Sequence, residues 1–212
     1  MAGPERARAW RAYYTEKRIG HQWMQLDLLG GLPATRVLEV GPHLGLVTAM
    51  LANAGYDVVT LDRGPRRFER PAGPHLEIDL TRLDPAAIRG FDAILCCETL
   101  EHLAWADVPG VLRAFRAAGA PHLIVSVPYE GLQFHLSLYV NPWRFRQRVA
   151  FRKGRSLRRF EAGPPGAHQW EVGWRGMPLR TWERALQAAG WRIARRTFSA
   201  GCRSVFHVLE AR

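Results

Sequence analysis

The chain has 212 residues, of which 47% are hydrophobic and eight are tryptophan, a composition that excludes a disordered or low-complexity protein. Thirty lysines and arginines against 19 acidic residues give a net charge of +11, which would suit a polyanionic partner but equally an arginine-rich surface. The three cysteines form no zinc or disulfide pattern, no apolar run is long enough to cross a membrane, and the charged start MAGPERARAW does not resemble a signal peptide. We therefore expect a cytoplasmic protein with no transmembrane segment.

Residues 1–33 are predicted to form an N-terminal helical cap, because aromatic and leucine side chains recur there at helical spacing until the sequence GGLP. From residue 34 to 130, strand-like and helical patterns alternate. Strands are expected at 36–40, 57–61, 75–78, 91–97 and 122–127, and helices at 44–54 and 101–118. The strand-like runs are apolar on both faces, which is typical of a parallel sheet covered by helices, and the alternation is that of a doubly wound α/β fold.

Residues 131–178 interrupt this alternation with a basic and aromatic insertion. The pattern then resumes over residues 179–212, which predict a C-terminal helix and an antiparallel strand pair, with bounds at 179–189, 191–198 and 204–211. We expect all of these parts to belong to a single domain.

The sequence EVGPHLG at 39–45 lies between a predicted strand and a predicted helix, where nucleotide-binding loops occur. It lacks the Lys-Ser or Lys-Thr of a phosphate-binding P-loop. The dinucleotide fingerprint fails as well, because His43 and Leu46 occupy positions that need glycine. Glu39 would repel a pyrophosphate, whereas an acid suits S-adenosylmethionine (SAM), which carries an ammonium, a sulfonium and no phosphate.

Four features in register resemble class I SAM-dependent methyltransferases: this loop, Asp62 after the second strand, Asp79 in EIDL, and FDAILCCETLEHL at 91–103. The resemblance implies a Rossmann-like, seven-stranded, mostly parallel sheet with the insertion as a substrate lid. It implies that the loop binds the methionine part of SAM, that Asp62 binds the ribose hydroxyls, and that Arg63 and Asp79 lie near the adenine. The implied cofactor-binding residues are Glu39, Gly41, His43, Gly45, Asp62, Arg63, Asp79, Leu80, Cys97 and Glu98.

His43 departs from the glycine pattern of this loop. One interpretation is that its side chain faces solvent or packs locally, and the other is that the imidazole lines the methionine pocket. Because His43 carries a β-carbon, we expect its backbone to avoid the conformations that favour glycine.

Glu98, Glu101 and His102 have the spacing i, i+3 and i+4, which places them on one face if a helix begins there. With His168 they resemble two groups, the ubiquinone-biosynthesis O-methyltransferases and the small-RNA 3′-terminal 2′-O-methyltransferases. In the second group, equivalent side chains hold a divalent metal. Glu98, Glu101, His102 and His168 are thus candidate ligands, better suited to Mn²⁺, Fe²⁺ or Zn²⁺ than to Mg²⁺. The metal is the less favoured interpretation, since this superfamily often carries Leu-Glu-His without one. His102, His135 and His168 are candidate proton acceptors.

The insertion contains eight cationic residues within 144–159, interleaved with aromatic residues. Three interpretations are open: an RNA-binding surface over 144–160, a basic amphipathic segment on an anionic membrane, and a cap helix with a solvated arginine face. We expect a SAM-dependent methyltransferase that acts on a small or lipid-like acceptor at oxygen. The alternatives are an RNA methyltransferase and a non-catalytic SAM-binding or partner-binding domain. The sequence leaves the oligomeric state open.

Overall fold

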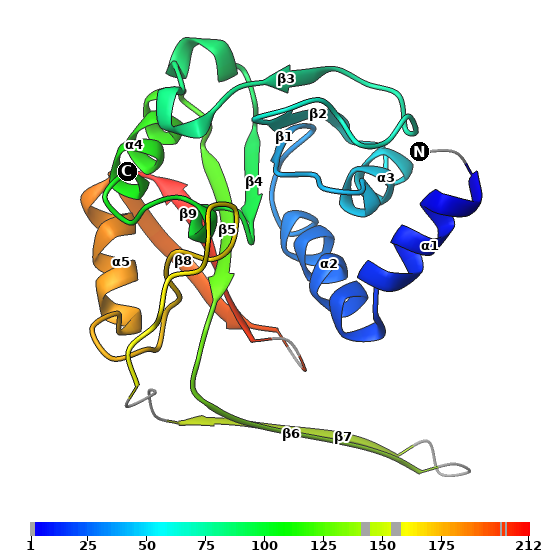
Figure 1. Cartoon of the computed structure of the whole chain (residues 1–212), viewed down its shortest axis with the longest axis vertical. Helices are drawn as coiled ribbons and strands as arrows, with labels where there is room; N and C mark the ends of the chain where they lie inside the picture. Colours follow the sequence, from blue (N-terminus) through cyan, green and yellow to red (C-terminus); the bar gives the residue numbers. More distant parts are fainter. Residues whose placement is uncertain (1–2, 141–144, 154–157, 200, 202) are drawn as a thin grey trace.

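The computed structural model describes residues 3–140, 145–153, 158–199, 201 and 203–212, and it centres on a seven-stranded sheet (Figure 1). The strands are β1 (Arg36–Val40), β2 (Asp57–Asp62), β3 (His75–Glu77), β4 (Ala93–Cys97), β5 (His122–Pro128), β8 (Trp191–Phe198) and β9 (Ser204–Ala211). Their order is β3-β2-β1-β4-β5-β9-β8, and only β9 runs against its neighbours. The predicted mostly parallel sheet and the C-terminal antiparallel pair are confirmed.

Helices cover both faces of the sheet. On one face lie α2 (Glu16–Leu29) and α3 (Leu46–Asn53), and on the other α4 (Val108–Ala117) and α5 (Leu179–Ala188), together with the short turns η1 (Leu80–Arg82) and η2 (Pro85–Ile88) (Figure 1). The consecutive residues Val37 and Leu38 of β1 are fully buried in different apolar clusters, one per face. Successive strand residues point to opposite faces, so burial on both sides explains the continuous apolar runs of the sequence.

The N-terminal cap consists of two helices, since α1 (Gly3–Tyr13) ends before Thr15, whose side chain caps α2 by accepting a hydrogen bond from the Arg18 N–H. A helix N-terminus exposes unpaired N–H groups, and threonine satisfies one of them there. None of the described helices has both the length and the hydropathy needed to cross a bilayer.

The helix predicted at 101–118 is wrong at its start, because α4 begins at Val108 after the N-cap residue Asp107. Pro109 lies in the first turn of α4, where its missing N–H costs nothing. In a helix beginning at 101 it would lie inside and break the helix. Residues Leu100–His102 instead form a single 3-10 turn, η3. The prediction that Glu98, Glu101 and His102 share one helical face is therefore also wrong.

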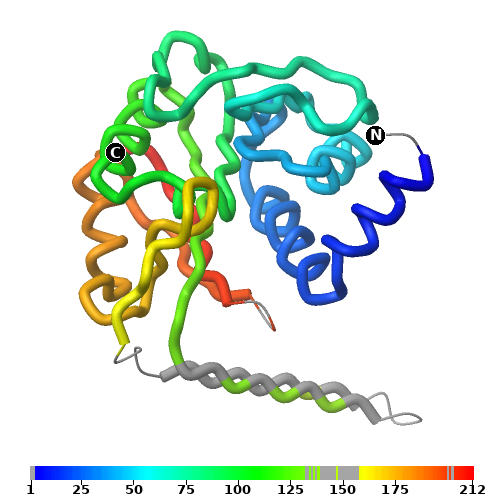
Figure 2. The backbone as a smooth tube through the Cα atoms, in the orientation of Figure 1, coloured from blue at the N-terminus to red at the C-terminus, as the bar shows by residue number. Residues whose placement is uncertain are grey.

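The insertion begins with a β-hairpin of β6 (Leu132–Val140) and β7 (Phe145–Lys153), which pair only with each other among the described strands. The cap-helix interpretation of this segment is therefore wrong. Apolar residues of β6 recur at every second position, the period of a strand rather than of a helix. Figure 1 shows the hairpin beyond the end of β5, set apart from the sheet and helices, and Figure 2 traces the chain as it leaves β5.

Candidate active site

A cavity of about 950 Å³ lies at the carboxyl ends of the parallel strands, between the sheet, the N-terminal helices and the segment around His168. Ligands of doubly wound sheets bind at this edge, because the loops that follow the strands converge there. The cavity is lined by most of the predicted site residues: Glu39, Gly41, His43, Asp62, Arg63, Asp79, Leu80, Cys97, Glu98, Glu101, His102 and His168. The chain thus gathers in one place residues that are up to 129 positions apart, from Glu39 to His168.

The glycine loop needs glycine at two positions for steric reasons. Gly41 has a φ of 73°, and a β-carbon there would lie 2.5 Å from Thr99 Oγ1. Gly45, the N-cap of α3, has a φ of 80°, and a β-carbon there would lie 2.6 Å from the Phe68 ring. Left-handed backbone and close neighbours both exclude larger residues, so the loop stays thin beside the cavity.

Glu39 is a buried acid in the wall of the cavity. Its Oε2 accepts a hydrogen bond of 2.6 Å from the Thr48 hydroxyl, and burial raises the pKa of its carboxyl to about 7. A carboxyl that is removed from water in this way gains from a cation brought beside it. Glu39 can therefore serve as the anionic partner of a positively charged ligand group.

His43 has a φ of 49°, so the prediction that its backbone avoids glycine-favouring conformations is wrong. The reason is the tight turn of the loop, in which the Gly45 N–H donates to the Pro42 carbonyl at 2.8 Å. The half-buried imidazole packs on the Tyr13 ring with centroids 4.1 Å apart while it also borders the cavity. Burial, followed by Arg67 and Arg18, lowers the pKa of His43 and favours the neutral ring.

Asp62 and Asp79 form the acidic side of the cavity near the end of β2. Asp62 Oδ1 accepts a hydrogen bond of 2.7 Å from the Arg63 N–H. Asp79 follows the end of β3 and caps η1, where it accepts bonds from the N–H and hydroxyl of Thr81, and these bonds lower the pKa of its carboxyl. Both side chains are thus held as hydrogen-bond acceptors beside the cavity.

Glu98 is held by two residues that sequence reasoning missed. Its backbone has a φ of 51°, and its Oε1 accepts a hydrogen bond of 2.9 Å from Ser126 Oγ on β5. The buried His21 of α2 places its Nε2 3.6 Å from the same oxygen and 3.3 Å from Ser126 Oγ. This network ties the N-terminal helices to the sheet, and no sequence motif indicates it, because the pairing depends on how α2 packs.

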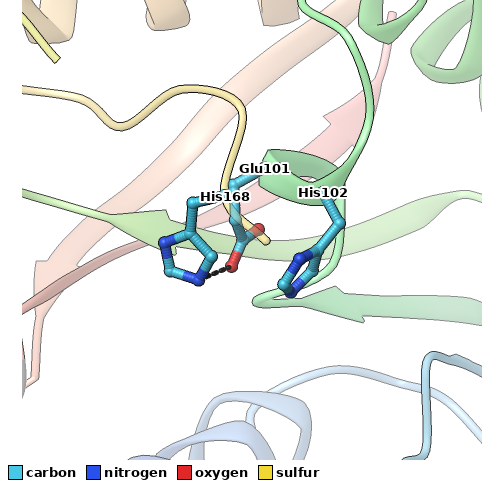
Figure 3. A group of neighbouring side chains, drawn as sticks. All are labelled: Glu101, His102 and His168. Atoms are coloured by element: carbon cyan, nitrogen blue, oxygen red, sulfur yellow. Dashed lines mark ion pairs between the residues drawn. The ribbon is translucent and has the colours of Figure 1, made fainter. Parts of the chain in front are cut away.

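Glu101, His102 and His168 converge at the other end of the cavity (Figure 3). One ligand atom from each lies within 4.8 Å of the others. Glu101 is fully buried, and neither of its carboxylate oxygens has a hydrogen-bond partner among the described residues. The Nε2 of His168 lies 3.9 Å from Glu101 Oε1, too long for a hydrogen bond.

Electrostatics at this cluster follow from burial. Burial raises the pKa of Glu101 well above its usual range, and the neighbouring carboxylates Glu98 and Glu171 raise it further. Burial, followed by the nearby His168, lowers the pKa of His102. Without a cation the cluster therefore favours a neutral carboxyl and a neutral imidazole.

His168 is oriented by Glu171, another residue that sequence reasoning missed. Its Nδ1 and Glu171 Oε1 are 2.8 Å apart, while Trp174 Nε1 donates to Glu171 Oε2 at 3.0 Å. This leaves Nε2 of His168 on the side of Glu101 (Figure 3). The only signal in the sequence is a carboxylate three residues after the histidine. The segment that carries His168 is anchored beside Glu101 through the main chain, since the Gln169 N–H donates to the Glu101 carbonyl at 2.7 Å.

Gly45, His135 and Glu98 each differ from what the sequence predicted or from what the structure describes. Gly45 is at the start of α3, beneath Phe68, rather than in the wall of the cavity. His135 belongs to β6, but its side chain is outside the described residues, as are Arg144 and Arg155 of the basic segment. Glu98 is held by Ser126 and His21 and lies outside the group formed by the other three candidate metal ligands.

Comparisons with known proteins agree with this geometry. A family model described as a methyltransferase domain matches residues 7–195. The demethylmenaquinone methyltransferase of Beutenbergia cavernae is 34% identical over 134 residues, which cover 55% of this chain and 54% of the relative. The ubiquinone biosynthesis O-methyltransferase of Methylocella silvestris is 27% identical over 165 residues, which cover 73% of this chain and 54% of the relative. The chain therefore spans about half the length of these curated relatives.

Among solved structures, a glycopeptide N-methyltransferase in complex with S-adenosylhomocysteine has a TM-score of 0.62 at 16% identity, and the alignment covers 100% of this chain and 99% of that one. At this identity the likeness concerns the fold, and it agrees with the strand order of the sheet. Since the family model also matches most of the chain, the protein belongs to the methyltransferase domain family and has the Rossmann-like fold of the class I SAM-dependent methyltransferases.

Proposed function

We propose that the protein transfers a methyl group from SAM to an oxygen atom of a small, lipid-like acceptor. The observation that carries the proposal is that one cavity joins the glycine loop and Asp62 to the cluster of Glu101, His102 and His168. Its volume of about 950 Å³ is at the upper end of the range of roughly 300–1,000 Å³ typical of small-molecule sites, which suits a cofactor and a small acceptor side by side.

In this proposal the loop side of the cavity binds SAM. The thin wall at Gly41 lets the methionine part approach the backbone, and Glu39 faces the ammonium group, whose charge favours the ionised carboxylate. Asp62 accepts from the ribose hydroxyls. Arg63, Asp79 and Leu80 surround the adenine, and Cys97 and Glu98 complete the pocket near the sulfonium.

The acceptor binds at the histidine end of the cavity. Its hydroxyl oxygen attacks the methyl carbon in line with the carbon–sulfur bond, an O–C bond forms as the C–S bond breaks, and the sulfonium leaves as a neutral thioether. His168 Nε2 takes the hydroxyl proton, while Glu171 holds Nδ1 and thereby the orientation of the ring. A hydroxyl needs such a base more than an amine does, and this favours oxygen as the methylated atom.

The names of the relatives support the class of acceptor. One is named for demethylmenaquinone and the other for ubiquinone biosynthesis and O-methylation. Both names point to quinone-type molecules, and the apolar side of the cavity, which includes Leu103, Val40 and Pro128, suits such a ring. We therefore propose a hydroxylated aromatic or quinol acceptor.

The Asp62→Ala variant tests the cofactor claim. We expect SAM affinity to fall by about 10- to 100-fold, because hydrogen bonds to a charged acceptor contribute about 1.5–3 kcal/mol. Asp57→Ala is the matched control, since Asp57 begins the same strand, forms an exposed ion pair with Arg36 and is not part of the cavity. Isothermal titration calorimetry measures both affinities. No SAM binding by the wild type, or equal losses in both variants, would contradict the proposal.

The same cluster fits a divalent metal ion, which we propose as the alternative to proton removal by His168, because its Nε2 cannot bind an ion and accept a proton at the same time. The fit rests on Glu101, a buried carboxyl whose two oxygens lack hydrogen-bond partners in the described chain, and on two imidazoles within reach. Glu101, His102 and His168 would hold the ion, and this mixed oxygen and nitrogen set suits Mn²⁺ or Zn²⁺. When bound, such an ion would lower the pKa of an acceptor hydroxyl.

Metal binding is tested by titrating the protein with Mn²⁺ alone. We expect Glu101→Gln to weaken binding by at least about 100-fold, because even outer-shell partners of metal ligands contribute 10- to 100-fold. Glu98→Gln is the matched control, as Glu98 lies three residues earlier but outside the group, and it should retain Mn²⁺ binding. If the wild type binds no Mn²⁺, or if both variants lose it equally, the assignment of the ion to Glu101, His102 and His168 is contradicted, and His168 Nε2 stays available as the base.

A further inference from the structure

The hairpin of β6 and β7 exposes large apolar side chains on one of its faces. Phe134, Leu136 and Leu138 are 53%, 51% and 47% exposed, and as every second residue of β6 they share a face. The hairpin pairs with no other described strand. A two-stranded hairpin is at best marginally stable alone in water. An exposed apolar face of this kind therefore indicates a surface for binding another molecule or a membrane.

The charge of this segment indicates what kind of molecule or membrane the hairpin binds. Residues 131–160 contain eight cationic residues and no acidic one. In the pairing register, Arg146 and Arg148 of β7 lie opposite Tyr139 and Ser137, which alternate with the exposed apolar residues of β6. The hairpin thus combines one apolar set of positions with a strongly cationic strand.

The hairpin also begins at the rim of the cavity. Pro128, the last residue of β5, lines the cavity, and β6 begins shortly after it. The connection is anchored, since Tyr129 forms a β-bridge with Val172 and Glu130 forms an ion pair with Arg203, which also lines the cavity. A body bound to the hairpin would therefore lie on the side of the cavity where β5 ends.

We propose that the hairpin docks the protein on an anionic lipid bilayer, with the face of Phe134, Leu136 and Leu138 in the interfacial region and the cationic residues near lipid phosphates. Apolar burial and attraction to anionic headgroups act together in such binding. A second copy of the chain is disfavoured because it would bring two such cationic segments together. RNA is disfavoured because two of the three exposed residues, Leu136 and Leu138, offer bases no ring for stacking. This docking goes beyond the proposed methyl transfer.

Vesicle co-sedimentation of the full chain, without cofactor or acceptor, tests the docking, so its failure is distinguishable from failure of methyl transfer. The vesicles contain phosphatidylglycerol and phosphatidylcholine in equal parts, or phosphatidylcholine alone. We expect binding to the anionic vesicles to be at least about 10-fold stronger than to the neutral ones, and to weaken as salt is added. The variant Phe134→Ser/Leu136→Ser/Leu138→Ser should lose at least about 10-fold in binding.

The matched control is Ile19→Ser/Trp23→Ser, which removes the comparably exposed apolar side chains of α2, at 48% and 58%, and should keep vesicle binding. Thermal unfolding shows that each variant is folded. The proposal is overturned if the wild type does not bind anionic vesicles or binds neutral ones equally well. It is equally overturned if the Ile19→Ser/Trp23→Ser control loses as much vesicle binding as the triple variant. It is also overturned if the triple variant turns a dimer into a monomer, or if a single-stranded RNA oligonucleotide binds more tightly than the vesicles.

Discussion

The His168→Ala variant is expected to lose about 100- to 10,000-fold in kcat while its affinity for SAM stays unchanged. Proton removal by a positioned base contributes a factor of this size, and Nε2 of His168 is the ring nitrogen left available by the bond of 2.8 Å between Nδ1 and Glu171. The residue lies at the histidine end of the cavity rather than at the glycine loop, which is why cofactor affinity should survive. Formation of S-adenosylhomocysteine with a short-chain hydroxyquinol measures kcat, and calorimetry measures SAM affinity.

Two companion variants sharpen this test. Glu171→Gln keeps a hydrogen-bond partner for Nδ1 but removes the charge, so its kcat should fall between those of the wild type and His168→Ala. His122→Ala alters a histidine that begins β5, at the end of the strand opposite the cavity, and it should leave kcat unchanged. A His168→Ala enzyme with wild-type kcat would exclude His168 as the base.

The Gly173→Ala variant is expected to lower the free energy of unfolding by about 2–6 kcal/mol, the sum of backbone strain and overpacking, each about 1–3 kcal/mol. Gly173 has a φ of 96°, and a β-carbon there would lie 1.8 Å from the carbonyl oxygen of Glu130. The clash is with main chain that cannot move freely, because the Glu130 N–H donates to the Val172 carbonyl at 2.7 Å. Denaturant unfolding measures the loss.

The Gly176→Ala variant separates the cost of backbone strain from the cost of the steric clash with Glu130. Gly176 has a φ of 95°, nearly the same as Gly173, but a β-carbon there would meet no atom within 4 Å. This variant should lose only the strain component of about 1–3 kcal/mol. Because the contact at Gly173 holds the segment of His168 and Glu171 against β5, Gly173→Ala should also reduce kcat, whereas Gly176→Ala should not. Equal losses of stability in the two variants would show that the contact with Glu130 is unimportant.

Much of the fold could be predicted from the sequence because its signals are local. The runs around Val37 and Ile94 are apolar on both faces, which only a sheet covered on both sides can bury. The loop at 39–45 could be predicted from its residue types, since Gly41 and Gly45 adopt left-handed conformations that glycine reaches without strain. His43 also adopts a left-handed conformation, although a residue with a β-carbon was expected to avoid it.

Local signals failed where a competing local rule or a distant contact decides the conformation. The spacing of Glu98, Glu101 and His102 suggests a helix, but Pro109 confines the helix start to Val108. In the insertion, the dense arginines suggested a solvated helix, whereas the alternation of Phe134, Leu136 and Leu138 specifies a strand.

The sequence by itself determined the sheet, its helical covering and the chemistry of the loop, since these depend on residue type and on periods of two to four residues. Only the tertiary structure decided which distant side chains meet: His168 beside Glu101, Glu171 behind His168, and His21 and Ser126 on Glu98. Such contacts depend on how helices and loops pack over the ends of the strands. That packing is set by the burial of whole surfaces, and no short stretch of sequence encodes it.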